Sequence, residues 1–124
     1  MKEILIDACG WAACVDAQLN MDAQLDAVLG PTTWLLPSSV LAELNQLNAD
    51  RPKRKALLMP LLLSRSTLVP SKEGHTDDIL FEMALERKCC TLTVDRELKR
   101  RLFEANLPVL EVKRGSFLHL VDSL

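Results

Sequence analysis

Two short apolar runs that each end in an aspartate constrain the fold of this chain more than any other feature. Residues 3–7 read Glu-Ile-Leu-Ile-Asp, and residues 91–95 read Thr-Leu-Thr-Val-Asp. Each run precedes a segment of helical composition, so both are predicted to be strands of one parallel sheet. Parallel strands end at the same edge of a sheet, and neighbouring strands lie about 4.8 Å apart. Asp7 and Asp95 are therefore expected to share one crevice.

The rest of the sequence alternates predicted strands with predicted helices. Strands are expected at residues 2–6, 32–36, 67–69, 89–94 and 108–112, the last followed by a short C-terminal tail. Helices are expected at residues 10–29, as one helix or as two with a break near Asn20, and at residues 40–48, 52–66, 77–88 and 95–105. Pro60 is expected to bend or divide the helix over 52–66, and Ser38, Ser39 and Thr76 are the expected N-cap residues. This order predicts an α/β fold, a three-layer α/β/α sandwich around a central parallel sheet of about five strands, in a single domain covering residues 1–124.

Composition is that of an ordinary globular protein, with 48% hydrophobic and 26% charged residues among 124. The formal net charge of −2 neither predicts nor excludes a nucleic-acid partner, because the distribution of the basic residues matters more than their sum. No segment has the uninterrupted apolar length of a signal peptide or a membrane span. We therefore expect a cytoplasmic protein without a membrane partner.

The four cysteines follow no metal-binding or disulfide pattern. Cys9, Cys14, Cys89 and Cys90 have the spacing of neither a zinc pair nor a small secreted disulfide scaffold. They are predicted to be buried free thiols of a reducing compartment. Trp11 and Trp34 are interpreted as core or dimer-contact residues, with base stacking as the less favoured alternative.

Further acidic residues are predicted near the edge where Asp7 and Asp95 lie. On a helix over residues 40–48, Glu43 flanks an apolar stripe, at the margin of the buried face, where a carboxylate needs a partner. Asp77 and Asp78 fall in the first turn of a later helix. Converging carboxylates suit a hard divalent ion, which can activate water and bind a scissile phosphate. The aspartates also have a structural interpretation, because Asp7 and Asp95 could cap the helices that follow them, and Asp77 and Asp78 could complement a helix dipole. This alternative is weaker for Glu43, because surface acids usually avoid the margin of an apolar stripe.

Two basic clusters are candidates for contact with a phosphate backbone. The first cluster comprises Arg51, Lys53, Arg54 and Lys55, and the second comprises Arg96, Lys99, Arg100 and Arg101. Lysine and arginine near an anionic cleft would give salt-dependent nucleic-acid binding. The alternative interpretation, a solvated helix face, is equally compatible with the sequence.

The motifs around the acids resemble those of PIN-domain nucleases in their usual order. They are Ile-Leu-Ile-Asp at residues 4–7, Pro-Ser-Ser-Val-Leu-Ala-Glu-Leu at 37–44, Thr-Asp-Asp-Ile-Leu-Phe-Glu-Met-Ala at 76–84 and Thr-Val-Asp-Arg-Glu-Leu at 93–98. Within the family, the chain is most similar to the single-domain archaeal and ribosome-biogenesis type, which acts in rRNA processing. The resemblance implies a Mg²⁺- or Mn²⁺-dependent endoribonuclease acting on single-stranded RNA. It implies that Asp7, Glu43, Asp77 and Asp95 are metal ligands, with Asp78 as a further or alternative ligand.

The chain departs from the family pattern at two positions. Cys9 stands where serine or asparagine is frequent, and Val94 stands where asparagine is common. Both changes are expected to remove hydrogen bonds to the acidic residues, which changes metal affinity by roughly 10- to 100-fold.

Other functions remain open at this stage. One is a non-catalytic RNA-binding or ribosome-assembly module with a pre-ribosomal partner, and another is a toxin-type PIN ribonuclease paired with an antitoxin. A homodimer is an expectation from related domains. A dinucleotide-binding fold is disfavoured, because Gly10 is the lone glycine after the first predicted strand.

Overall fold

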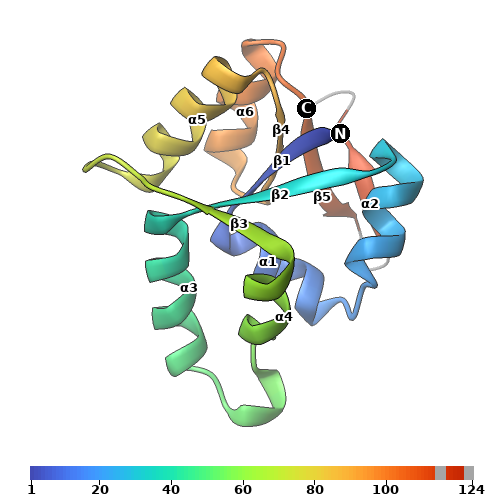
Figure 1. Cartoon of the computed structure of the whole chain (residues 1–124), viewed down its shortest axis with the longest axis vertical. Coiled ribbons are helices and arrows are strands. Elements are labelled where there is room, and N and C mark those ends of the chain that lie inside the picture. Colours follow the sequence, from blue (N-terminus) through green and yellow to red (C-terminus); the bar gives the residue numbers. More distant parts are fainter. Residues whose placement is uncertain (114–116, 122–124) are drawn as a thin grey trace.

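A computed structural model describes residues 1–113 and 117–121 of the chain (Figure 1). The strands are β1 Lys2–Ile6, β2 Thr32–Pro37, β3 Ser66–Val69, β4 Cys90–Leu92, β5 Val109–Lys113 and β6 Phe117–Leu120. The helices are α1 Ala8–Asp16, α2 Met21–Leu29, α3 Ser38–Ala49, the short 3₁₀ helix η1 Lys53–Lys55, α4 Met59–Arg65, α5 Thr76–Arg87 and α6 Arg96–Glu104. They form one sheet in the order β3-β2-β1-β4-β5-β6. In Figure 1, α5 and α6 lie on one side of β1 and β2, and α1, α3 and α4 lie on the other.

The predicted α/β fold is confirmed, and the sheet differs from the expectation at one edge. β1 to β5 are parallel, whereas β6 pairs antiparallel with β5. β6 falls in the segment expected to be an irregular tail, whose residues 114–116 and 122–124 lie outside the described part of the chain. Only Leu118 of β6 is buried, so this edge strand lacks the apolar pattern that identifies the central strands.

The helix predicted over residues 52–66 is two separate elements, η1 and α4. Pro60 stands in the first turn of α4, where a missing N–H leaves no hydrogen bond unmade. The helix is divided as expected, but the division falls between Lys55 and Met59 rather than at Pro60. Leu58 precedes α4 with φ of 53°, in the left-handed region. The chain therefore changes direction at Leu58, and Pro60 helps to start the helix that follows.

The predicted N-cap residues belong to the helices themselves. The N-caps of α3 and α5 are Pro37 and His75, and neither makes a side-chain capping bond. Ser38 and Ser39 instead join α3 to the loop after β3. The backbone N of Ser71 donates to Oγ of Ser38 at 2.9 Å, and the backbone N of Ser39 donates to Oγ of Ser71 at 3.2 Å. These bonds fix the start of α3 beside the end of β3.

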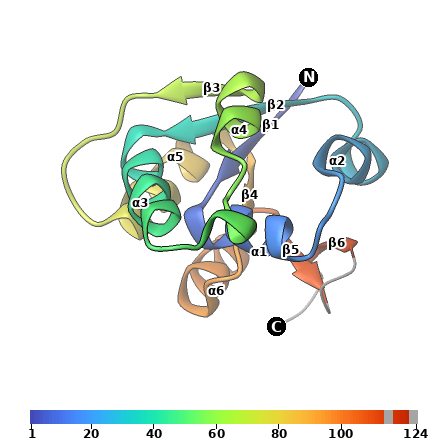
Figure 2. The same cartoon turned by 90° about the horizontal axis from the view of Figure 1, so that it is seen from below.

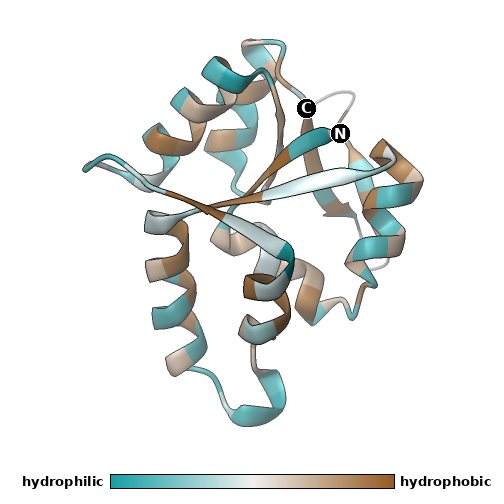
Figure 3. Ribbon diagram, viewed as in Figure 1, coloured by the Kyte–Doolittle hydropathy of each residue, from teal (hydrophilic) through white to brown (hydrophobic). Residues whose placement is uncertain are grey.

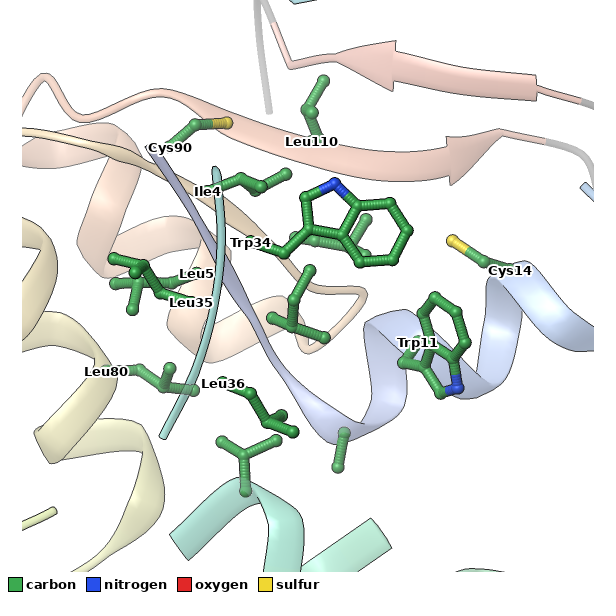
Figure 4. Packing of buried hydrophobic residues seen from close by; sticks show 14 of the residues in the cluster. Ile4, Leu5, Trp11, Cys14, Trp34, Leu35, Leu36, Leu80, Cys90 and Leu110 are labelled. Carbon is green, nitrogen blue, oxygen red and sulfur yellow. The ribbon is translucent and has the colours of Figure 1, made fainter. Parts of the chain in front are cut away.

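The core packs both tryptophans between the sheet and α1 (Figure 4). The ring centroids of Trp11 and Trp34 lie 5.9 Å apart, and both side chains are almost fully buried, so their predicted core role is confirmed. Cys14, Cys89 and Cys90 are buried free thiols, as expected, while Cys9 is half-buried. Among the described residues, no helix combines the length and the apolar character that a membrane crossing requires.

Gly10 allows α1 to approach the end of β4 closely. A Cβ at this position would lie 2.5 Å from the carbonyl oxygen of Leu92, which is a backbone atom and can move only with the strand. Glycine to alanine within a helix usually stabilises by up to about 1 kcal/mol. Here we expect Gly10→Ala to lower the free energy of unfolding by about 1–3 kcal/mol, because the added methyl group overpacks the junction. Urea denaturation tests this prediction, and a stabilised variant would contradict it.

Candidate active site

The candidate site lies at the carboxyl end of β1, where the connections between strands lead to opposite sides of the sheet. From β1 the chain continues to β2 and β3 on one side, whereas β4, β5 and β6 lie on the other side of β1. Ligands of open parallel sheets bind beyond the carboxyl ends of the strands at this switch point. Asp7 follows β1 and Asp95 lies three residues beyond β4. In Figure 2, α1, α3, α5 and α6 surround the end of β1.

Asp7 is held rigidly at this edge. Its side chain is only 4% exposed, and a buried carboxylate requires hydrogen-bond donors. Oδ1 accepts from the backbone N of Ala8 at 2.8 Å, which caps α1. Oδ2 accepts from Oγ1 of Thr93 at 2.7 Å and from Sγ of Cys9 at 3.2 Å. The carboxylate thus both caps a helix and faces the end of β4.

Thr93 joins the two aspartates that follow β1 and β4. Its hydroxyl donates to Oδ2 of Asp7 and accepts from the backbone N of Asp95 at 3.1 Å. Asp95 in turn caps α6, because its Oδ1 accepts from the backbone N of Leu98 at 2.8 Å. Thr93 is fully buried, and the sequence reasoning missed its role. The available signal was a threonine hydroxyl at the buried end of a strand, because most buried hydroxyls are hydrogen-bonded; Thr91 in the same segment shows that this signal alone does not identify the bridging residue.

The structure revises the expectation for Cys9, one of the two positions that depart from the family pattern. Burial, and then the negative charge of Asp7, raise the pKa of the Cys9 thiol to about 11. The thiol therefore keeps its proton at neutral pH and donates it to Asp7. The expected loss of a hydrogen bond at this position is wrong, because sulfur supplies a weaker one. Val94 brings no polar group, and the bond to the backbone of Asp95 comes from Thr93 instead.

Asp77 lies within electrostatic reach of three other acids. Burial, followed by the charges of Asp95, Asp7 and Glu43, raises the pKa of the Asp77 carboxyl, and Arg101 opposes this effect. Repulsion of this kind requires the carboxylates to be near one another. The acids at the end of β1, after β4 and on α3 therefore lie within electrostatic range of Asp77 in the first turn of α5.

The fourth of these acids, Glu43, lies on α3. The residue is exposed, whereas the sequence placed it at the margin of a wide buried stripe. Val40 and Leu44 are fully buried, but Leu47 is 41% exposed, so the stripe is narrower than expected. The Glu43 side chain makes no hydrogen bond with the described residues.

The carboxylate of Asp78 forms an ion pair with the guanidinium group of Arg101. Its Oδ1 accepts from Nη1 of Arg101 at 2.8 Å, and the guanidinium carbon of Arg101 lies 4.6 Å from the centroid of the Phe81 ring. The adjacent acids of α5 therefore differ, because the carboxylate of Asp78 is neutralised by Arg101 while Asp77 is exposed to the charges of the other acids.

The donor set fits a hard divalent ion held largely through water. In residues 1–113 and 117–121, no three His, Cys, Asp or Glu side chains are close enough to hold a metal ion as they stand. Mg²⁺ usually binds through one or two carboxylates and keeps several waters, so it does not need a closed cage. Carboxylate oxygens, with a protonated thiol behind them, also suit Mg²⁺ or Mn²⁺ better than soft metals.

The two predicted basic clusters differ in how far their charges are paired. On α6, Arg100 bonds to Glu97 and Glu104, Lys99 bonds to Glu111, and Arg101 bonds to Asp78. Arg96 makes no ion pair within the described chain. In the other cluster Arg51 pairs with Asp16, whereas Lys53, Arg54 and Lys55 are exposed and make no ion pair with any described residue. Of these two clusters, the one around η1 therefore holds more cations without an acidic partner among the described residues.

Comparisons with known proteins agree with this architecture. The structure of the PIN domain endonuclease Utp24 is similar with a TM-score of 0.78 and 20% sequence identity, covering 98% of this chain and 92% of that one. A domain of a functionally unknown protein from Methanocaldococcus jannaschii DSM 2661 is similar with a TM-score of 0.65 and 17% identity, covering 100% and 99% of the two chains. No curated protein sequence matches the chain. A sequence model described as a PIN-like domain matches residues 4–115, which is most of the chain. The chain therefore belongs to the PIN-like domain family.

Proposed function

We propose that this chain is a metal-dependent endoribonuclease that hydrolyses phosphodiester bonds of single-stranded RNA. The observation that carries the proposal is the junction of Asp7 and Asp95 through Thr93 at the switch point of the sheet. Membership of the PIN-like family supports a nuclease, because PIN domains are generally nucleases. The similar Utp24 structure, which is described as an endonuclease, gives the same support at the level of the fold.

Four acids are the proposed ligands of Mg²⁺ or Mn²⁺: Asp7, Glu43, Asp77 and Asp95. The bound ion would lower the pKa of a water molecule and compensate the charge of the scissile phosphate. Asp7 and Asp95 have fixed orientations, because hydrogen bonds hold both carboxylates in place. Asp77 is favoured over Asp78, whose carboxylate is paired with Arg101. Glu43, exposed and without a hydrogen bond to the described residues, is free to turn toward substrate or metal.

Single-stranded RNA is the proposed substrate, and the unpaired cations at η1 and at the start of α6 would hold its phosphate backbone. Lys53, Arg54 and Lys55 of η1 and Arg96 at the start of α6 carry charges that described acids do not neutralise. Such residues hold a phosphate backbone without reading its sequence. The proposal specifies no target sequence. It also requires no pre-ribosomal or antitoxin partner and no homodimer.

Cleavage of labelled single-stranded RNA tests the proposal directly. The protein should cut the RNA in the presence of Mn²⁺ or Mg²⁺ and should show no cleavage in EDTA. Duplex RNA serves as the comparison substrate. RNA that is bound in a salt-sensitive way but stays intact with every metal would instead identify a non-catalytic RNA-binding module. Activity that persists in EDTA would contradict the metal dependence.

Metal binding should also raise the stability of the fold. A ligand that binds only the native state at 100 times its dissociation constant stabilises it by about 2.7 kcal/mol. We expect Mn²⁺ to raise the thermal midpoint of the protein, and Asp95→Asn to lose most of this shift. Asp26→Asn removes an exposed acid of α2 and serves as the matched control, which should keep the shift. Equal shifts in both variants would argue against a metal site that includes Asp95.

A further inference from the structure

A cleft separate from the acidic site lies between the end of α1 and the segment of residues 51–56. Its volume is about 770 Å³, which is within the range of clefts that hold small ligands. The charged residues that line it are Asp16, Arg51, Arg54 and Lys55. Figure 3 shows hydrophilic residues throughout the loop that forms its lower wall.

Several specific hydrogen bonds hold the two walls of this cleft together. The guanidinium of Arg51 donates to both carboxylate oxygens of Asp16, at 2.7 and 3.0 Å, and Nη1 also donates to the carbonyl oxygen of Lys55 at 3.3 Å. The indole N–H of Trp11 donates to the carbonyl oxygen of Leu57 at 2.7 Å, from inside the core. Arg51 and Leu57 are therefore both hydrogen-bonded to side chains of α1.

The charge inside the cleft favours an anion. Arg51 and Asp16 neutralise each other, and their hydrogen bonds lower the pKa of Asp16 and raise that of Arg51. Arg54 and Lys55 are exposed and make no ion pair with any described residue, so they leave a net positive charge. Guanidinium and ammonium groups side by side are suited to the oxygens of a phosphate group.

The position of the cleft relates it to the acidic site through one rigid helix. α1 begins directly after Asp7 and ends at Asp16, so at about 1.5 Å per residue the two sites lie roughly 12 Å apart along its axis. A single RNA strand can cover this distance within a few nucleotides. We propose that the cleft binds one phosphate group of an RNA strand whose cleavage takes place at the acidic site. This inference rests on the proposed function for its substrate, although the binding itself requires no cleavage.

RNA binding in EDTA tests the cleft apart from the nuclease reaction. The full chain is titrated into a fluorescein-labelled single-stranded RNA of twelve nucleotides, and anisotropy is followed over a range of salt concentrations. The variant Arg54→Gln/Lys55→Gln should weaken binding roughly tenfold and reduce the salt slope by about 0.7, because the one lost phosphate contact contributes about 0.7 for single strands. The control Lys2→Gln/Lys88→Gln removes the same charge at the opposite end of β1 and β4, and should bind as the original chain does.

A second experiment distinguishes whether the cleft binds a phosphate group of RNA or free inorganic phosphate. Inorganic phosphate is titrated against the protein at constant ionic strength, with tryptophan fluorescence as the readout, since Trp11 is hydrogen-bonded to one wall. Unchanged RNA affinity and salt slope in Arg54→Gln/Lys55→Gln would overturn the proposal. The proposal would also be overturned if Arg54→Gln/Lys55→Gln weakened the binding of inorganic phosphate but left the binding of RNA unchanged. Loss of cleavage in Asp7→Asn with intact RNA binding bears on the acidic site alone, so the two proposals can fail separately.

Discussion

Replacing Asp95 by asparagine is expected to lower metal-dependent RNA cleavage by more than about 100-fold while the fold stays intact. Asparagine caps a helix about as well as aspartate, so the bond to the backbone N of Leu98 can be kept. The substitution therefore removes one negative charge from the acidic site and little else. The kcat/KM for a labelled single-stranded RNA, together with the urea midpoint, measures both parts of the prediction.

Asp7→Asn should reduce cleavage as strongly, and the control Asp26→Asn should not. In Asp7→Asn the amide has one acceptor oxygen for donors that now reach both carboxylate oxygens, so some stability is also lost. The effect on cleavage must therefore be corrected for the folded fraction. Cleavage at the original rate in both Asp7→Asn and Asp95→Asn would dispose of the nuclease proposal.

Thr93→Val is expected to have the second largest effect, on stability and cleavage together. Valine keeps the shape of threonine but leaves Oδ2 of Asp7 and the backbone N of Asp95 without the hydroxyl they bond. Leaving buried groups unsatisfied costs about 1–3 kcal/mol of folding free energy. Misplacing residues that hold a metal reduces activity by roughly 10- to 100-fold. Urea unfolding and the metal concentration needed for half-maximal cleavage report the two effects separately.

The chain offers a matched control two residues earlier. Thr91 is equally buried in β4, but its Oγ1 has no hydrogen-bond partner. Thr91→Val should be neutral or stabilising, because it removes a hydroxyl that is buried without a bond. Thr93→Ser, which restores the hydroxyl, should recover most of the cleavage. If Thr91→Val and Thr93→Val behaved alike, the bridge between the aspartates would have no functional importance.

The central strands could be predicted from the sequence because each is a short, nearly continuous apolar run. β1 and β4 are buried on both faces, and their residues identify them without tertiary information. β6 could not be predicted, since its pairing with β5 depends on a long-range contact and only one of its residues is buried. The split between η1 and α4 arises from the left-handed backbone at Leu58, which a leucine gives no reason to expect.

The candidate site shows the same division between local and long-range information. The placement of Asp7 and Asp95 follows from their position after neighbouring parallel strands. Arg100 has acids three residues before and four residues after it, so its pairing was available from spacing alone. The pairs Arg101 with Asp78 and Lys99 with Glu111 join different elements, and no local pattern indicates them. Nor does the helical stripe reveal that Leu47, and with it Glu43, faces water.

The capping bonds of Asp7 and Asp95 affect how inactive relatives should be recognised. Because both residues start a helix, a descendant that had lost its chemistry would still keep a short polar side chain at both positions for stability alone. Glu43 makes no hydrogen bond with the described residues, so under the proposed function its retention would reflect metal or substrate binding rather than the start of a helix. When sequences of this type are divided into active and inactive proteins, the presence of the glutamate is therefore a better indicator of activity than the presence of either aspartate.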